Sequence, residues 1–93
     1  MDKFEILSRK VETDNQYHYT EYYKVRVYDP RLTEDDVLEW AKTNINREAI
    51  TDKEYHAMPA WQQHEAAVYF KPYMTASYRD GIWHITVSLN LAD

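Results

Sequence analysis

Residues 73–91 read YMTASYRDGIWHITVSLNL, and the Asp80-Gly81 pair at their centre decides the fold of this segment. Both residues suit a two-residue hairpin turn, because the central positions of a type I′ turn need positive φ. The turn sets a register in which apolar residues share one face, in the pairs Tyr78–Trp83, Ala76–Ile85 and Met74–Val87. The other face carries polar side chains: Thr75, Ser77, Arg79, His84, Thr86 and Ser88. The pattern therefore predicts a hairpin that is buried on one side.

Two further strands are expected near the N-terminus, at 4–11 and at 17–28, because both segments are rich in β-prone residues. A two-residue turn at Asp14-Asn15 would place apolar residues opposite one another, in the pairs Ile6–Tyr23 and Phe4–Val25. Glu21 interrupts the aromatic residues of the second strand, so a bulge is expected near it.

Pro30 ends the second strand, and Thr33 with Asp36 three residues later has the spacing of a helix N-cap. A helix is predicted over 34–46, with an apolar stripe at Val37, Leu38, Ala41 and Ile45. Thr51 or Asp52 suits the cap of a short second helix that ends near residue 58. The next segment is open between a helix over 60–67 and a strand over 65–70.

The order β-β-α-(α)-(β)-β-β predicts one α+β domain over residues 1–93. Its antiparallel sheet should have four or five strands, with one or two helices packed on one face. Trp83 is expected at the centre of the core. The predicted core side of the sheet is Tyr23, Val25, Val27, Trp83, Ile85, Val87 and Leu89.

Bulk composition narrows the function classes. The chain has 93 residues, a formal net charge of −5 and no Cys, which excludes disulfides and thiolate chemistry. No apolar run approaches the length of a membrane span, and the first residues lack the apolar core of a signal peptide, so a cytoplasmic location is expected. The negative charge disfavours general binding to phosphate backbones and permits basic protein partners.

No catalytic or cofactor-binding signature emerges. The single glycine excludes a Gly-rich phosphate loop, and no Ser lies in a nucleophile-elbow motif. The four His residues, His18, His56, His64 and His84, lack the spacing of metal ligands. The sequence therefore predicts a protein that is not an enzyme and that uses no cofactor or metal.

An acidic cluster lies at the start of the predicted first helix, with the members Glu34, Asp35, Asp36 and Glu39. Carboxylates there gain stability from the helix macrodipole, which accounts for the first three without any function. The functional alternative is an acidic patch that docks on a basic protein surface.

The polar side of the sheet offers a second candidate surface. Basic and aromatic residues should lie together on it: Tyr22, Lys24, Arg26, Tyr28, Arg79 and His84. Such a face is typical of an ordinary solvated sheet, but it also suits protein binding, or single-stranded nucleic acid held by stacking and phosphate contacts.

The sequence thus favours a small non-enzymatic protein-binding domain, an inhibitor, adaptor or regulator whose partner is another protein. Its small size and lack of a recognisable motif are compatible with a regulator encoded by a phage or mobile element. The alternative is a single-stranded nucleic-acid binder that uses the basic and aromatic face. A homodimer through the Tyr-rich second strand stays open under either hypothesis.

Overall fold

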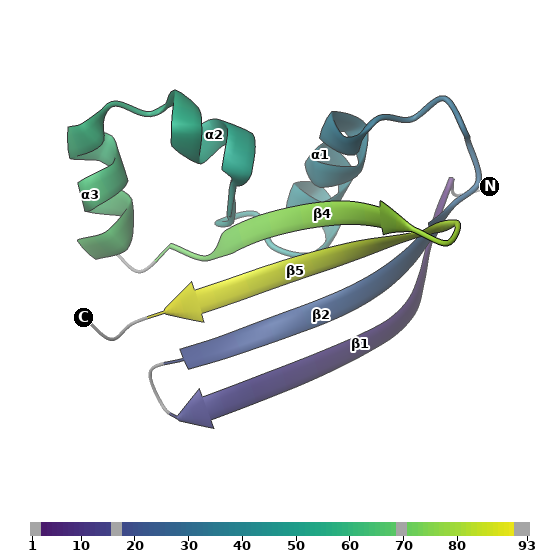
Figure 1. Ribbon diagram of the computed structural model, residues 1–93, viewed down its shortest axis with the longest axis horizontal. Coiled ribbons are helices and arrows are strands. Elements are labelled where there is room, and N and C mark those ends of the chain that lie inside the picture. Colours follow the sequence, from purple (N-terminus) through teal and green to yellow (C-terminus); the bar gives the residue numbers. More distant parts are fainter. Residues whose placement is uncertain (1–2, 16–17, 69–70, 91–93) are drawn as a thin grey trace.

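The computed structural model describes residues 3–15, 18–68 and 71–90. Its elements, in chain order, are β1 (Phe4–Asn15), β2 (His18–Val27), α1 (Glu34–Asn44), β3 (Ile50–Thr51), α2 (Asp52–Ala57), α3 (Ala60–Val68), β4 (Tyr73–Arg79) and β5 (Ile82–Asn90). The strands form one sheet in the order β1-β2-β5-β4-β3, antiparallel except where β3 runs parallel to β4 (Figure 1). The predicted α+β fold is confirmed.

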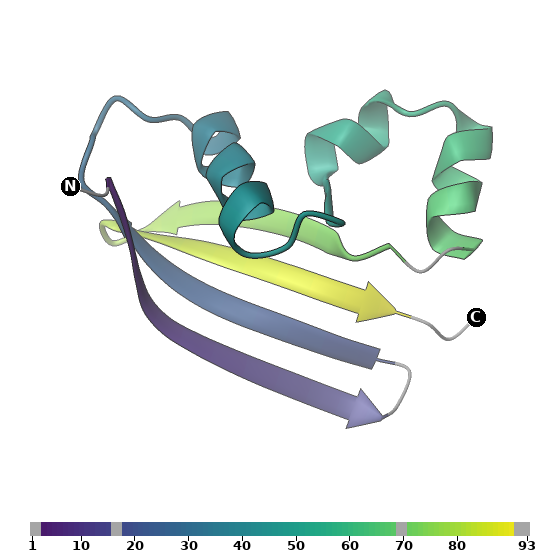
Figure 2. The same cartoon turned by 180° about the vertical axis from the view of Figure 1, so that it is seen from behind.

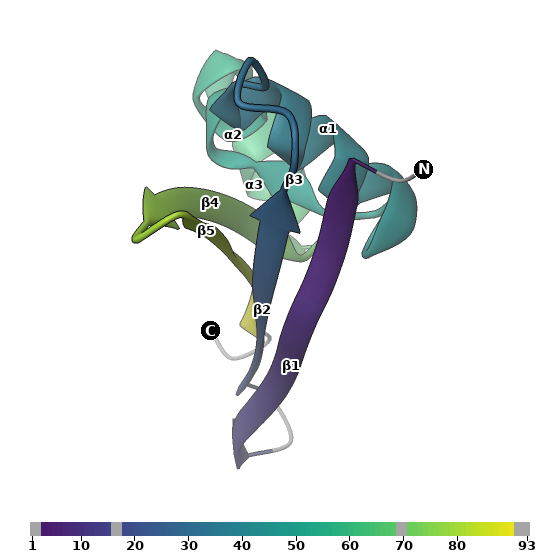
Figure 3. The same ribbon diagram turned by 90° about the vertical axis from the view of Figure 1, so that its right-hand side faces the viewer.

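All three helices lie on one face of the sheet, which we call the inner face; the opposite face is the outer face. Seen from behind, α1 crosses above the sheet, α2 lies above the end at which β4 begins, and α3 extends beyond that end (Figure 2). Seen from the side, the helices gather above β4 and β5, and most of β1 extends away from them (Figure 3). The helical layer therefore covers the inner face only in part.

The predicted β4–β5 register is confirmed in full. The pairs Tyr78–Trp83, Ala76–Ile85 and Met74–Val87 all form. Asp80 and Gly81 have φ of 54° and 79°, the double positive φ of a type I′ turn. A turn that only certain residues can adopt thus fixed the alignment of both strands.

The predicted β1–β2 register is wrong by two residues. Phe4 pairs with Val27 and Ile6 with Val25, and β1 continues through Asn15, so the turn is not at Asp14-Asn15. The connecting residues 16–17 lie outside the described residues. Alternating apolar positions on both strands fit either alignment, so the register depended on a turn signal that was too weak to decide it.

The bulge expected near Glu21 is also misplaced. The register shifts lie in β1, between Ile6 and Ser8 and between Thr13 and Asn15. Glu21 continues the β2 ladder opposite Val11, with its side chain on the inner face. Its charge is accommodated by hydrogen bonds there and needs no irregular backbone.

Both predicted helix caps form. Thr33 and Thr51 are the N-caps of α1 and α2, each in a reciprocal capping box with the residue three positions later. Residues 60–68 are helical, so the alternative strand from residue 65 is wrong as far as Val68. The fifth strand is instead β3, which is two residues long and therefore too short to show a pattern.

The core lies between α1 and the middle strands. Its buried hydrophobic members are Tyr23, Val25, Val37, Leu38, Ala41, Ala49, Met74, Ile85 and Val87. Trp83 lies partly buried at the margin of this cluster and not at its centre, which corrects the prediction. At the N-terminal end of β1, Phe4 stacks on Trp40 of α1 with the ring centroids 4.5 Å apart. The side chain of Leu89 lies outside the described part of the chain.

Candidate functional site

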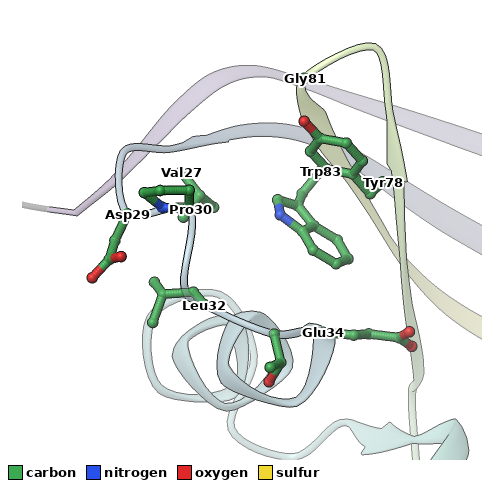
Figure 4. Close-up of a pocket in the computed structure, with 9 residues that line it drawn as sticks. Val27, Asp29, Pro30, Leu32, Glu34, Tyr78, Gly81 and Trp83 are labelled. Carbon is green, nitrogen blue, oxygen red and sulfur yellow. The ribbon is translucent and has the colours of Figure 1, made fainter.

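A groove lies where the β4–β5 hairpin tip approaches the connection between β2 and α1. We call it the hairpin groove; it encloses about 530 Å³ and is lined by Val27, Asp29, Pro30, Leu32, Thr33, Glu34, Tyr78, Gly81 and Trp83. Tyr78 and Trp83 form one wall, and Val27, Pro30 and Leu32 lie across from them (Figure 4). The two walls come from segments about 50 residues apart in the chain, so the fold and not a local motif creates the groove.

The aromatic wall is unusually open to solvent. Tyr78 is 63% exposed, although its ring packs edge-on against Trp83 with the centroids 5.4 Å apart. The type I′ turn fixes the pair, because it sets Tyr78 directly opposite Trp83. The groove therefore offers a preformed aromatic surface that the core does not use.

Of the two carboxylates that line the groove, one is already bound by a neighbouring residue and, within the described residues, the other is not. Asp29 accepts hydrogen bonds from the side chain of Arg31 and from its backbone N–H, at 3.0 Å each, and these contacts lower the pKa of Asp29 well below its usual range. Its carboxylate points away from the hairpin (Figure 4). Glu34 projects from the first turn of α1, and no ion pair joins it to another residue of the described ranges. Glu34 is thus the carboxylate left for a ligand.

The rest of the predicted acidic cluster is dispersed. Asp36 accepts hydrogen bonds from the backbone N–H (2.8 Å) and hydroxyl (3.0 Å) of Thr33 and so serves the helix cap. Asp35 forms an ion pair with Lys53 at 2.9 Å. Asp35 and Glu39 lie beside α2 and line a shallow hollow there, away from the hairpin groove. The cluster does not form one acidic patch.

The predicted basic and aromatic surface comes together in part. Four of its six members, Tyr22, Lys24, Arg79 and His84, line one hollow of about 380 Å³ on the outer face, together with Ser8 and Lys10 among others. We call this the outer-face hollow. Lys24 pairs with His84 across β2 and β5, which places two potential cations side by side. The other two members lie elsewhere: Arg26 is opposite Glu5, and the Tyr28 hydroxyl donates to Glu5 at 2.9 Å.

A polar cluster around the buried Glu21, on the inner face, was not predicted. Glu21 is only 9% exposed and accepts hydrogen bonds from the hydroxyls of Tyr19 and Tyr23 and from Nη2 of Arg9, the last at 3.1 Å. Nε of Arg9 also donates to the Tyr23 hydroxyl at 3.0 Å. We call these four residues the Glu21 cluster. Arg9 could have been recognised as a partner only if the β1–β2 register had been known.

The surroundings of Glu21 favour the ionised form of its carboxyl group. Burial opposes ionisation of Glu21, but the hydrogen bonds from Tyr19, Tyr23 and Arg9 outweigh it and lower the pKa of this carboxyl. Burial and the Glu21 carboxylate raise the pKa of Tyr19 to about 12. Acid–base catalysis instead favours groups with a pKa near the working pH. This cluster therefore holds a charge in place and is poorly suited to transferring a proton.

Within the described residues, no three His, Asp or Glu side chains gather as ligands for a metal ion. In the same part of the chain, no helix is both long enough and apolar enough to cross a membrane. Comparison with protein families, with curated proteins and with solved structures finds no significant match to this chain. The functional argument therefore has to come from the geometry of the surface.

Proposed function

We propose that this chain is a small protein-binding domain, an inhibitor, adaptor or regulator and not an enzyme, and that the hairpin groove receives a segment of its partner. The observation that carries the proposal is the open aromatic wall, because Tyr78 is 63% exposed beside the partly buried Trp83. Tyr and Trp are enriched at protein interfaces, where they supply large contact areas at low entropic cost. The proposal keeps the cytoplasmic setting expected from the sequence.

The residues that line the groove indicate which side chains the partner segment should carry. The apolar walls suit an apolar or aromatic side chain, and Glu34 at the rim suits a neighbouring Lys or Arg. The net charge of −5 would also speed the approach of a basic partner. Asp35 and Glu39 contribute to that long-range attraction without lining the groove.

A displayed library of random peptides tests this proposal without knowledge of the natural partner. We expect the wild-type protein to enrich peptides in which an apolar or aromatic residue lies next to Lys or Arg. Tyr78→Ala should weaken the selected peptides roughly 30-fold, the size of an interface hot spot. Glu34→Lys should weaken them more strongly at low salt than at high salt, since an exposed charge pair is screened by ions.

A matched control comes from α3. Trp61 is 61% exposed, close to the value for Tyr78, but lies outside the groove. Trp61→Ala should leave peptide binding unchanged, and Asp35→Lys with Glu39→Lys should slow association while the peptide still binds. Selected peptides that bind Tyr78→Ala as well as they bind the wild type would contradict the proposal.

A second candidate function rests on the outer-face hollow. Lys24, Arg79 and His84 surround it beside the 40% exposed ring of Tyr22, an arrangement suited to a phosphate and a stacked base of single-stranded nucleic acid. Under this alternative, a labelled single-stranded oligonucleotide binds at physiological salt. Lys24→Ala and Arg79→Ala would each reduce the salt dependence by about one released counterion, whereas Tyr78→Ala would have no effect.

A further inference from the structure

Strand β1 forms a long free edge of the sheet. It has 12 residues, and β2 is its only neighbour in the sheet order. β1 is the lowest strand in Figure 1, with no described element beyond it. The Tyr-rich β2 is paired on both sides, so the edge open to another chain is β1 and not the second strand considered from the sequence. One side of the β1 backbone thus has no partner among the described residues.

The same strand carries three exposed aliphatic side chains. Among the described residues, the exposed large aliphatic side chains are Ile6 (47%), Leu7 (38%) and Val11 (41%), and all three belong to β1. Isolated exposed apolar residues are common in proteins, but three on one unpaired edge mark a surface that strand addition would cover.

The position of the bulge gives the edge an internal symmetry. Leu7 is the extra residue between Ile6 and Ser8, so the alternation of faces changes there. Before the bulge, Phe4 and Ile6 pair with Val27 and Val25 and share their inner face. After the bulge, Arg9 and Val11 pair with Tyr23 and Glu21 and share the inner face as well.

A second copy of β1 can therefore be placed antiparallel beside the first by a 180° rotation about an axis that passes through the Leu7–Ser8 bond, perpendicular to the sheet. The inner-face residues of both copies then lie on the same side. Residue 4 then meets residue 11, and residue 6 meets residue 9, always on the inner face. A bulge and basic residues usually protect an edge from pairing. A bulge at the centre of a two-fold arrangement instead lies opposite its own copy, so it leaves both arms free to pair.

The charges of the outer face fit the same arrangement. Glu5 pairs with Arg26 and Lys10 with Tyr22, so both side chains lie on the outer face. In the reversed copy Glu5 meets Lys10, and two-fold symmetry makes this contact twice. Opposite charges directly across an antiparallel pair are favourable, so the edge is complementary in charge to itself.

We propose that β1 is a homodimer interface, at which a second copy of this chain adds antiparallel about an axis near Leu7–Ser8 and joins two five-stranded sheets into one. The hairpin groove is lined by residues of β2, β4, β5 and the connection between β2 and α1, and by none of β1, so this inference does not depend on the proposed function. A dimer would present two grooves, one on each copy.

Cross-linking tests the position of the axis, and the absence of Cys from the chain makes single substitutions clean. In Leu7→Cys the two sulfurs lie about one residue apart, within reach of a disulfide. In Thr13→Cys they lie roughly 36 Å apart along the strands, at ~3.3 Å per residue. Mild oxidation of dilute protein should give a covalent dimer with Leu7→Cys and not with Thr13→Cys. Equal cross-linking of both, or of neither, would overturn the proposal.

Charge exchange tests the pairing itself. Light scattering after gel filtration, over a range of concentrations, should show wild-type mass rising from 11.2 kDa towards twice that value. Glu5→Lys or Lys10→Glu alone should weaken dimerisation roughly tenfold, and the double variant should restore it. Glu39→Lys, on α1 and outside β1, should leave dimerisation unchanged, and circular dichroism would verify that each variant is folded. A monomer at every concentration, or a double variant weaker than both single variants, would refute the interface.

Discussion

The backbone at Gly81 shows how one residue can fix an alignment. Its φ of +79° lies in the left-handed region, and the nearest atom to an added Cβ would be the Tyr78 hydroxyl at 4.0 Å. A side chain would therefore meet open space, and its cost would come from the backbone alone. A substitution at Gly81 therefore tests backbone strain alone, without a steric clash of the new side chain.

Gly81→Val should lower the free energy of unfolding by about 1–3 kcal/mol, because a β-branched residue tolerates positive φ poorly. Gly81→Asn should cost clearly less, since Asn adopts the left-handed region more readily. Urea denaturation of the three proteins measures the difference. Equal losses for Val and Asn would show that backbone strain is not the cause.

Glu21 ties stability to pH. Its hydrogen bonds hold its pKa below the ordinary value of 4.5, so its ionised form contributes stability at neutral pH and loses that contribution as the pH falls through the lowered pKa. Glu21→Gln should cost about 1–3 kcal/mol at pH 7, because an amide cannot accept all the hydrogen bonds that converge there. The variant should also show a shallower loss of stability in acid.

Urea denaturation at several pH values between neutrality and 3 would measure this effect. Glu48→Gln, on an exposed turn, is the control and should reproduce the wild-type slope. A Glu21→Gln protein as sensitive to acid as the wild type would contradict the assignment.

Among the elements, α1 owes its start to one reciprocal cap. The Thr33 hydroxyl accepts from the Asp36 N–H at 3.4 Å, while the Asp36 carboxylate accepts from the Thr33 N–H at 2.8 Å. Thr33→Ala should cost about 1 kcal/mol in thermal or urea unfolding. Thr43→Ala, an exposed Thr inside the same helix, should cost nothing measurable, because Ala favours helix. Similar losses for both would argue against the cap.

The elements also explain which predictions succeeded. The Asp80-Gly81 turn and the Thr33 cap are local signals with few alternatives, so the sequence predicted the second hairpin and α1 correctly. The first hairpin failed because Val25 and Val27 are interchangeable partners for the apolar residues of β1. The two-residue β3 is held by pairing with β4, and no local pattern could reveal it.

The candidate surfaces were predictable to the same limited degree. The outer-face residues Lys24 and His84 were expected together because strand alternation places them on one side. The hairpin groove was not expected, because its two walls, which include Leu32 and Tyr78, come from distant parts of the chain. The Glu21 cluster was not predicted, because the predicted β1–β2 register was wrong and did not place Arg9 opposite Tyr23.

Across the whole molecule, packing is uneven. The core cluster joins α1 to the sheet, and it includes none of residues 60–65, the part of α3 whose side chains the structure describes. Residues 60–65 have no buried side chain, and Gln63 is tied to the preceding turn by hydrogen bonds to the carbonyls of Tyr55 (2.9 Å) and Met58 (3.2 Å). α3 should therefore open without disturbing the rest of the fold.

Amide hydrogen exchange tests this distribution. The amides of His64 and Glu65 should exchange roughly 100-fold faster than those of Ala41 and Lys42, because residues 60–65 hold no buried side chain whereas Ala41 is buried in the core. Addition of moderate urea should accelerate the α1 amides and leave the α3 amides nearly unchanged. Exchange of both helices at one common rate would show that the molecule opens only as a single unit.

The Glu21 cluster carries an evolutionary consequence. The hydroxyls of Tyr19 and Tyr23 and Nη2 of Arg9 converge on one carboxylate, so substitution of Glu21 alone removes the acceptor that two phenols share, while Nε of Arg9 keeps its bond to the Tyr23 hydroxyl. Selection should therefore treat these four positions as one inherited unit. In descendants of a common ancestor, loss of the acid at position 21 should accompany loss of Arg9, and aliphatic residues should replace the quartet together.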